Sequence, residues 1–102
     1  MPAVTTLNLS DLGNGERFVA QNGERVRYCH PWAAWLTWDG YRWGRDRDGE
    51  VWRLATTTVR SIYGEAAESA AADERKAISL HAIRSEGERR IAAMLELAKR
   101  LR

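Results

Sequence analysis

The sequence predicts an α+β domain with an N-terminal helix, a small antiparallel sheet containing a Trp-rich hairpin, and three C-terminal helices. Two patterns support this fold class. The stretch from Trp32 to Trp43, WAAWLTWDGYRW, holds four of the five tryptophans and has the alternation and turn residues of a β-hairpin. From Glu50 onward, apolar residues recur at the spacing of amphipathic helices. A two-stranded hairpin alone is marginal in water, so we expect the helices to cover the sheet.

The composition is that of a soluble globular protein, with 44% hydrophobic and 29% charged residues. The 102 residues suffice for one modest core, either as a single domain or as a fragment of a larger chain. No apolar run approaches the roughly 20 residues that span a bilayer, and no signal peptide is recognisable. The only cysteine, Cys29, excludes an internal disulfide. We therefore expect a cytoplasmic protein that does not contact membranes.

The N-terminal part is expected to comprise a loose segment, residues 1–8, followed by one α+β domain over residues 9–102. Ser10 is a typical helix N-cap, and Asp11 places a negative charge in the first turn, where the helix dipole favours it. The helix should end at Gly23, in the left-handed conformation common after helices. Its apolar positions are Leu12, Phe18 and Val19.

The expected sheet has three short antiparallel strands. Residues 26–29 form the first, which ends before His30-Pro31 because proline removes a hydrogen-bond donor. Residues 35–38 and 41–43 form the hairpin, joined by a two-residue type I′ turn at Asp39-Gly40. Alternation places Trp35 and Thr37 on one face, with Leu36 and Trp38 on the other.

Three helices are expected to follow, the first beginning at Glu50 and the second covering residues 74–84, with a break near residues 69–73. The capping box Ser85-x-x-Glu88 predicts the start of the last helix at Ser85. The buried positions expected in the three helices are Val51, Leu54, Ala55, Thr58 and Ile62 in the first, Ala77, Ile78, Leu80 and His81 in the second, and Ile91, Met94, Leu95, Ala98 and Leu101 in the third.

The sequence contains no catalytic constellation and no recognisable cofactor site. Neither a phosphate-binding G-x-x-x-x-G-K-[ST] loop nor a dinucleotide-binding G-x-G-x-x-G fingerprint is present. One cysteine and two histidines lack the spacing of a zinc site, and His81 is better explained as a hydrogen-bonded core residue than as a base for Cys29. The acidic residues of GRDRDGE, residues 44–50, favour a solvated turn over a divalent-metal loop, because arginines interleave with them. We expect no catalysis, no cofactor and no metal.

The tryptophans leave three interpretations open. They could serve only as core residues, since a small domain needs large apolar side chains. However, four tryptophans on a two-faced hairpin cannot easily all point inward, so one or two should stay partly exposed. Exposed aromatic residues beside arginine suit either a protein contact or the stacking of single-stranded bases. The candidate contact residues in the hairpin are Trp35, Trp38, Tyr41, Arg42 and Trp43.

A cluster of basic residues at the C-terminus also has two interpretations. Its members are Arg89, Arg90, Lys99, Arg100 and Arg102. They could complement the dipole of the last helix and lie on a solvated face, or they could contact phosphates. The net charge of +2 does not decide between these interpretations.

The order of the segments resembles the N-terminal domain that precedes the helicase in phage and plasmid primase–helicases, and in those of poxviruses. The segments are LSDLGNGERFVAQNGERVRYCH, WLTWDGYRW, DGEVWRLATTTVRSIYGEA and SEGERRIAAMLELAKR, so the resemblance covers about residues 9–102. In that family the domain lies between a primase module and a superfamily 3 ATPase ring. The resemblance implies a non-catalytic accessory domain that supports subunit assembly and guides DNA.

From the resemblance we also expect the partners to be the adjoining primase and helicase domains or other subunits of the replication complex, with oligomer formation and single-stranded DNA as further expectations. The alternative function is a direct single-stranded DNA-binding module that uses Trp/Tyr stacking and the C-terminal basic cluster. Because the sequence has no ATPase motif before Arg102, motor activity does not transfer. The chain resembles an excised domain or a small stand-alone relative.

Overall fold

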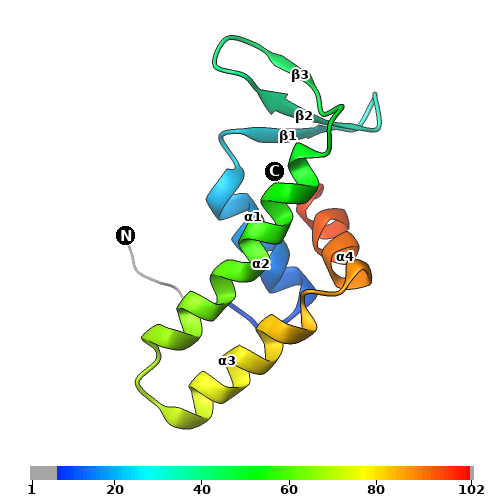
Figure 1. Cartoon of the computed structure of the whole chain (residues 1–102). Coiled ribbons are helices and arrows are strands. Elements are labelled where there is room, and N and C mark those ends of the chain that lie inside the picture. Colours follow the sequence, from blue (N-terminus) through cyan, green and yellow to red (C-terminus); the bar gives the residue numbers. More distant parts are fainter. Residues whose placement is uncertain (1–6, 102) are drawn as a thin grey trace.

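A three-stranded antiparallel sheet lies at one end of a group of four helices (Figure 1). The computed structural model describes residues 7–101. Its elements are α1 (Asp11–Asn22), β1 (Val26–Cys29), β2 (Ala34–Trp38), β3 (Trp43–Arg45), α2 (Glu50–Glu68), α3 (Ala72–Arg84) and α4 (Glu88–Ala98). The predicted fold class, with one helix before the sheet and three after it, is confirmed.

The helices do not cover the sheet in the expected way. α1 packs against α4 and α2, and α3 packs against α2. α3 lies at the end of the molecule opposite the sheet (Figure 1), so the expectation that all three C-terminal helices cover the sheet is wrong. α2 leads the chain away from the sheet, and α3 returns beside α2 but ends before it reaches the strands (Figure 1). The molecule is elongated, with extents of 44 × 30 × 21 Å.

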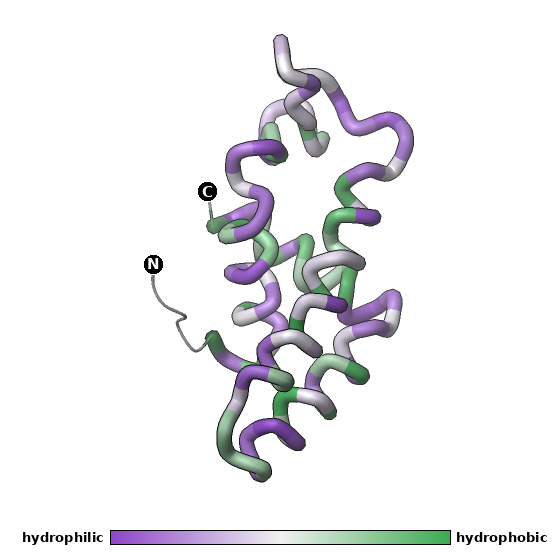
Figure 2. Tube along the Cα trace, turned by 60° about the vertical axis from the view of Figure 1, so that its left-hand side comes forward, coloured by the Kyte–Doolittle hydropathy of each residue, from purple (hydrophilic) through white to green (hydrophobic). Residues whose placement is uncertain are grey.

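The hydrophobic core joins α1, β1, α2 and α4. It contains Phe18, Val26, Val51, Ala55, Val59, Ile91, Met94, Leu95 and Ala98. The predicted apolar stripes of α2 and α4 supply most of it, and Figure 2 shows hydrophobic and hydrophilic segments alternating along these helices. Burying this set of side chains stabilises the fold by roughly 1.5–3 kcal/mol for each large aliphatic or aromatic residue.

Four expected inward positions are wrong. Leu12 is exposed because it lies on the side of α1 away from the core, and Leu101 is exposed because α4 already ends at Ala98. In α3, Ala77 and Leu80 are exposed, whereas His81 and Ala82 are buried. Only the last turn of α3 packs into the interior, so the inward stripe is shorter than the periodicity suggests.

Both ends of α1 lie where they were predicted, but the conformation at its C-terminal end differs. Ser10 Oγ accepts a hydrogen bond from the backbone N–H of Gly13 at 3.0 Å, as an N-cap does. Gly23 terminates the helix with φ −62°, so the predicted left-handed conformation is wrong. Its N–H still donates to the carbonyl of Val19 at 2.8 Å, which keeps the backbone right-handed through the cap.

The hairpin loop is longer than predicted. Trp38 pairs directly with Trp43, so four residues, 39–42, form the connection, and the predicted two-residue turn is wrong. Oδ1 of Asp39 accepts hydrogen bonds from the backbone N–H groups of the last two loop residues, at 2.8 and 2.9 Å. An aspartate that binds the backbone ahead of it in this way stabilises a wider loop than a type I′ turn.

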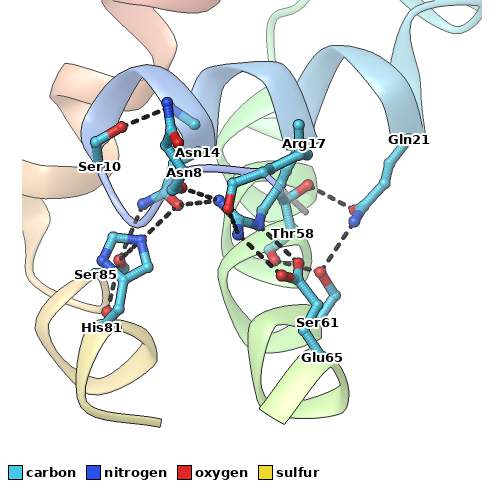
Figure 3. A network of polar contacts seen from close by, with 12 residues as sticks. Asn8, Ser10, Asn14, Arg17, Gln21, Thr58, Ser61, Glu65, His81 and Ser85 are labelled. Atoms are coloured by element: carbon cyan, nitrogen blue, oxygen red, sulfur yellow. Dashed lines mark hydrogen bonds and ion pairs between the residues drawn. The ribbon is translucent and has the colours of Figure 1, made fainter. Parts of the chain in front are cut away.

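A buried polar network links α1 to α2 and α3 (Figure 3). Arg17 donates to both carboxylate oxygens of Glu65, from Nε at 2.6 Å and from Nη2 at 2.9 Å. Asn14 donates from Nδ2 to Ser85 Oγ at 2.9 Å, and its Oδ1 lies 2.9 Å from His81 Nε2. The predicted hydrogen-bonded core role of His81 is confirmed. Burial is the main cause that holds the pKa of His81 below its ordinary value of 6.5.

Ser85 belongs to this network and does not cap the last helix. Its hydroxyl donates to the carbonyl of His81 at 2.8 Å while accepting from Asn14. Gly87 is the N-cap of α4, so the predicted capping box is wrong. The buried amide N–H of Asn14 needs an acceptor, and leaving it without one would cost more free energy than leaving the start of α4 without a side-chain cap, because that start can bind water.

The segment before α1 is held by the same network. Nη1 of Arg17 donates to the carbonyl of Asn8 at 2.8 Å, and Nη2 donates to the carbonyl of Leu7 at 3.3 Å. These two residues lie in the stretch expected to be loose; residues 1–6 lie outside the described residues.

Candidate functional site

The surface of the sheet that faces away from the core combines indole and guanidinium groups. Strand pairing matches Leu36 with Arg27 of β1 and with Arg45 of β3, and matches Trp38 with Trp43. Directly paired residues share a face, as do residues two apart on one strand, so all five lie on one side. We call this side, together with the neighbouring Trp32, the outer face.

The opposite side packs onto the helices through Trp35. Its ring centroid lies 5.8 Å from that of Phe18 and 5.3 Å from that of Tyr28, both in edge-to-face geometry. The predicted separation of Trp35 from Trp38 onto opposite faces is confirmed. Trp35, which was expected among the contact residues, lies half-buried against the core and joins the sheet to α1.

Two arginines of the outer face lie over indole rings. The guanidinium carbon of Arg27 is 4.8 Å from the ring centroid of Trp43, and that of Arg45 is 5.0 Å from the ring centroid of Trp32. Such cation–π pairs contribute about 0.5–1 kcal/mol at exposed sites. The Trp38 and Trp43 rings are 5.5 Å apart and tilted by 56°. Trp32 and Trp38 nevertheless remain 57% and 42% exposed.

The tip of the hairpin carries two more of the predicted contact residues. Tyr41 is 90% exposed, and Arg42 is exposed beside it; both lie in the loop and not in the predicted strand. The backbone N–H groups of Arg42 and Tyr41 hold the pKa of the Asp39 carboxyl below its ordinary value. The tip therefore presents an aromatic ring and a cation, while its aspartate stays ionised and bound to the backbone.

The chain around the sheet is more basic than the chain as a whole. Residues 25–47 carry five arginines and two aspartates. The carboxylate of the second aspartate, Asp46, accepts the backbone N–H groups of Glu50 and Val51, both at 2.9 Å, and so caps α2. Burial raises its pKa, but these hydrogen bonds outweigh burial, and the pKa lies below the ordinary value. The expected solvated-turn role does not describe Asp46, although Asp48 remains exposed.

A cavity of about 300 Å³ lies behind the sheet, between β1 and the ends of α1 and α4. Phe18, Val19, Val26, Tyr28, Trp35 and Lys99 are among its lining residues. Nζ of Lys99 lies 4.5 Å from the Tyr28 ring centroid and 2.6 Å from Oε1 of Glu96. The hydrogen bond to Glu96 raises the pKa of Lys99. The cation at this cavity is therefore already paired with a carboxylate and an aromatic ring.

The C-terminal basic residues do not gather in one place. Arg89 and Arg90 lie in the first turn of α4, whereas Lys99 and Arg100 follow its last turn, about 15 Å along the helix axis at 1.5 Å per residue. Arg90 also lies 3.5 Å from Oδ1 of Asp11. Arg102 lies outside the described residues.

Comparison with protein-family models identifies the domain. The model described as "D5 N terminal like" matches residues 15–102, which is most of the chain. The chain belongs to the D5 N-terminal-like family. This is the domain that precedes the superfamily 3 helicase in D5-family primase–helicases, as the resemblance in the sequence indicated. Searches of curated proteins and of solved structures found no match.

In this D5 N-terminal-like domain, sequence reasoning missed three members of the outer face: Trp32, Arg27 and Arg45. A signal for two of them was present. In RVRY, residues 25–28, basic and apolar residues alternate with the period of a strand, and the same holds for the basic residues of WGRDR, residues 43–47. The pairing of Arg45 with Leu36 could not be predicted, because the expected two-residue turn would have paired Leu36 with Trp43 instead.

Among residues 7–101, no group of three or more His, Cys, Asp or Glu side chains is placed to hold a metal ion. Within the same residues, no helix is long and apolar enough to cross a membrane.

Proposed function

We propose that this domain is a non-catalytic accessory domain of a DNA-replication primase–helicase, where it supports subunit assembly and guides DNA toward the helicase. The observation that carries the proposal is the family match over residues 15–102, because domains of this family precede the helicase in D5-family primase–helicases. Its partners are then the adjoining primase and helicase domains or other subunits.

The two ends of the molecule suit these two tasks. The sheet end presents arginines and exposed indoles, which suit contact with DNA. At the other end, Leu80 and Ile83 of α3 are exposed, and apolar side chains of this kind are typical of protein interfaces. A domain with both surfaces and its own core can connect a neighbouring subunit to a DNA strand.

Deleting residues 9–102 from a full-length primase–helicase of this family tests the proposal. We expect a smaller oligomer by light scattering and slower unwinding of a forked DNA. The double variant Leu80→Asp/Ile83→Asp should reduce the oligomer size without unfolding the domain, because these residues are 43% and 57% exposed. Ala77→Asp, at an exposed position of the same helix, is the matched control. Unchanged oligomer size and unwinding in the deletion would refute the proposal.

A second candidate function is direct binding of single-stranded DNA by the isolated domain. It is favoured by one observation: Trp32 and Trp38 stay exposed, whereas Trp35 packs against the core. A titration of the chain with single-stranded DNA at low salt should quench tryptophan fluorescence. Absence of quenching would count against this function while leaving the assembly role intact.

A further inference from the structure

We infer, on the basis of the DNA-contacting role proposed above, that the outer face is the binding site and that it takes single-stranded DNA. In this arrangement bases stack on Trp32 and on the Trp38–Trp43 pair. Arg27 and Arg45 contact the phosphates between them. The C-terminal basic cluster contributes nothing to this site.

The indoles are placed for stacking. In Figure 1 the sheet projects from the end of the helices, which lie on the side of Trp35. The rings of Trp32 and Trp38 are therefore accessible, and the ring of Trp38 is fixed at one edge by Trp43. A planar aromatic surface held in place binds a nucleobase without base-specific hydrogen bonds, because every base has a π-face.

The two arginines supply uncompensated positive charge. Among residues 7–101, the ion pairs involve Arg17, Arg25, Arg53, Arg90 and Lys99. Neither Arg27 nor Arg45 forms an ion pair in this part of the chain. Each guanidinium is instead held over an indole, at 4.8 and 5.0 Å, where a small side-chain rotation brings it to a phosphate.

The spacing fits a strand of several nucleotides. One Arg–indole pair lies at the Trp38 end of β2, and the other involves Trp32, two residues before the Ala34 end. Four residues of strand separate Trp38 from Ala34, or about 13 Å at 3.3 Å per residue. This is the length of β2, and a short unstacked single strand can extend along it.

The surface discriminates against duplex DNA. In a duplex the base faces are occupied by their neighbours, so the indoles would have nothing to stack on. The outer face is one side of the three-stranded sheet β1-β2-β3, and its exposed indoles need the free face of an unstacked base. Binding should therefore require unpaired bases.

The experiment is a fluorescence-anisotropy titration of a labelled oligothymidine, about 12 nucleotides long, with the 102-residue chain at low salt. Trp32→Ala and Trp38→Ala should each weaken binding about 5- to 150-fold, the range for loss of one base–aromatic stack. Arg27→Ala and Arg45→Ala should each make the slope of log affinity against log salt shallower by about 0.7, as expected for one lost phosphate contact.

Matched controls use residues of the same type outside the sheet. Trp52→Ala removes a partly exposed indole of α2, and Arg84→Ala removes an exposed guanidinium of α3; both should bind as the parent chain does. Trp38→Phe keeps an aromatic face and should recover part of the affinity lost in Trp38→Ala. Thermal melting followed by circular dichroism verifies that each variant is folded. If Trp38→Ala does not fold, the affinity of folded Trp38→Phe still tests the site.

Several outcomes would overturn the inference. These are the absence of binding to the oligothymidine, equal affinity for a duplex of the same length, or unchanged affinity in both folded tryptophan variants. Loss of binding in Arg89→Ala/Arg100→Ala, with the sheet variants unaffected, would move the site to α4. That last result would refute the outer face as the site while preserving a DNA-contacting role, and only the deletion experiment bears on subunit assembly.

Discussion

Two glycines inside helices should respond in opposite directions to replacement by alanine. Helix propensity alone predicts that either replacement stabilises the fold by up to about 1 kcal/mol. Gly64 in α2 has open space around the position of a Cβ atom, so Gly64→Ala should follow that rule. At Gly13 in α1, an added Cβ would lie 2.0 Å from the carbonyl oxygen and 2.8 Å from the carbonyl carbon of Asn8.

The cost at Gly13 follows from what holds Asn8. The clash is with backbone, so it is relieved only by moving the segment before α1. That movement breaks the 2.8 Å hydrogen bond from Arg17 to the Asn8 carbonyl. A hydrogen bond from a charged group contributes about 1.5–3 kcal/mol, and overpacking typically costs about 1–3 kcal/mol. After the gain in helix propensity is subtracted, Gly13→Ala should lower the free energy of unfolding by about 2–4 kcal/mol.

Urea denaturation of the parent chain and the two variants measures this difference. The midpoint should fall for Gly13→Ala and rise slightly for Gly64→Ala, with the slope m unchanged in both. If Gly13→Ala is as stable as the parent chain, the close approach of Asn8 to α1 is not a property of the folded protein in solution. A change in m would instead indicate an altered denatured state.

Two further predictions concern the polar network. Glu65→Ala should lower the free energy of unfolding by about 2–3 kcal/mol, because it leaves the 2% exposed guanidinium of Arg17 without its carboxylate; this is below the usual range for a broken buried pair because Glu65 is 37% exposed. The control Glu68→Ala, at an exposed position of the same helix, should change the free energy of unfolding by less than about 0.5 kcal/mol in urea denaturation. Equal effects of the two substitutions would contradict the role of the Arg17–Glu65 pair. His81 should make stability depend on pH. Its folded pKa lies below 6.5, so as the pH falls below about 6.5 the unfolded chain takes up a proton first and the free energy of unfolding decreases. His81→Gln should remove that decrease in a series of urea titrations between about pH 7 and 5, and an unchanged pH dependence would show that another group causes it.

Local sequence signals predicted much of the fold. Ser10 caps α1 through a bond that spans only three residues, and the bounds of β1 follow from a short alternating run before a proline. The stripes of α2 and α4 depend on helix periodicity, which each helix carries within itself. In these cases the residues that determine the structure are close together in the sequence, so no knowledge of distant partners was needed.

The wrong predictions arise where a hydrogen-bonding or packing partner, distant in the sequence or competing with the local signal, determines the local structure. Ser85 has a complete local capping signal, but Asn14, 71 residues earlier, takes its hydroxyl as an acceptor. At the hairpin, the turn signal of residues 39–40 competes with the side chain of Asp39 and with the contact between Trp38 and Trp43. The prediction of the candidate site was affected most, because the wrong turn changes which residues of β3 lie beside β2.

The register of the sheet therefore determines stability and the proposed site together. Trp35 points to Phe18 and fixes β2 against the core, while its neighbours Leu36 and Trp38 point outward beside Arg27. A slip of one residue would move every side chain of a strand to the opposite face. Such a slip of β2 would turn Trp35 outward and Leu36 toward the helices, so the packing of Trp35 against Phe18 excludes it. Because the core already fixes this register, the outer face is ordered before any ligand arrives, and binding loses less conformational entropy than it would on a flexible hairpin.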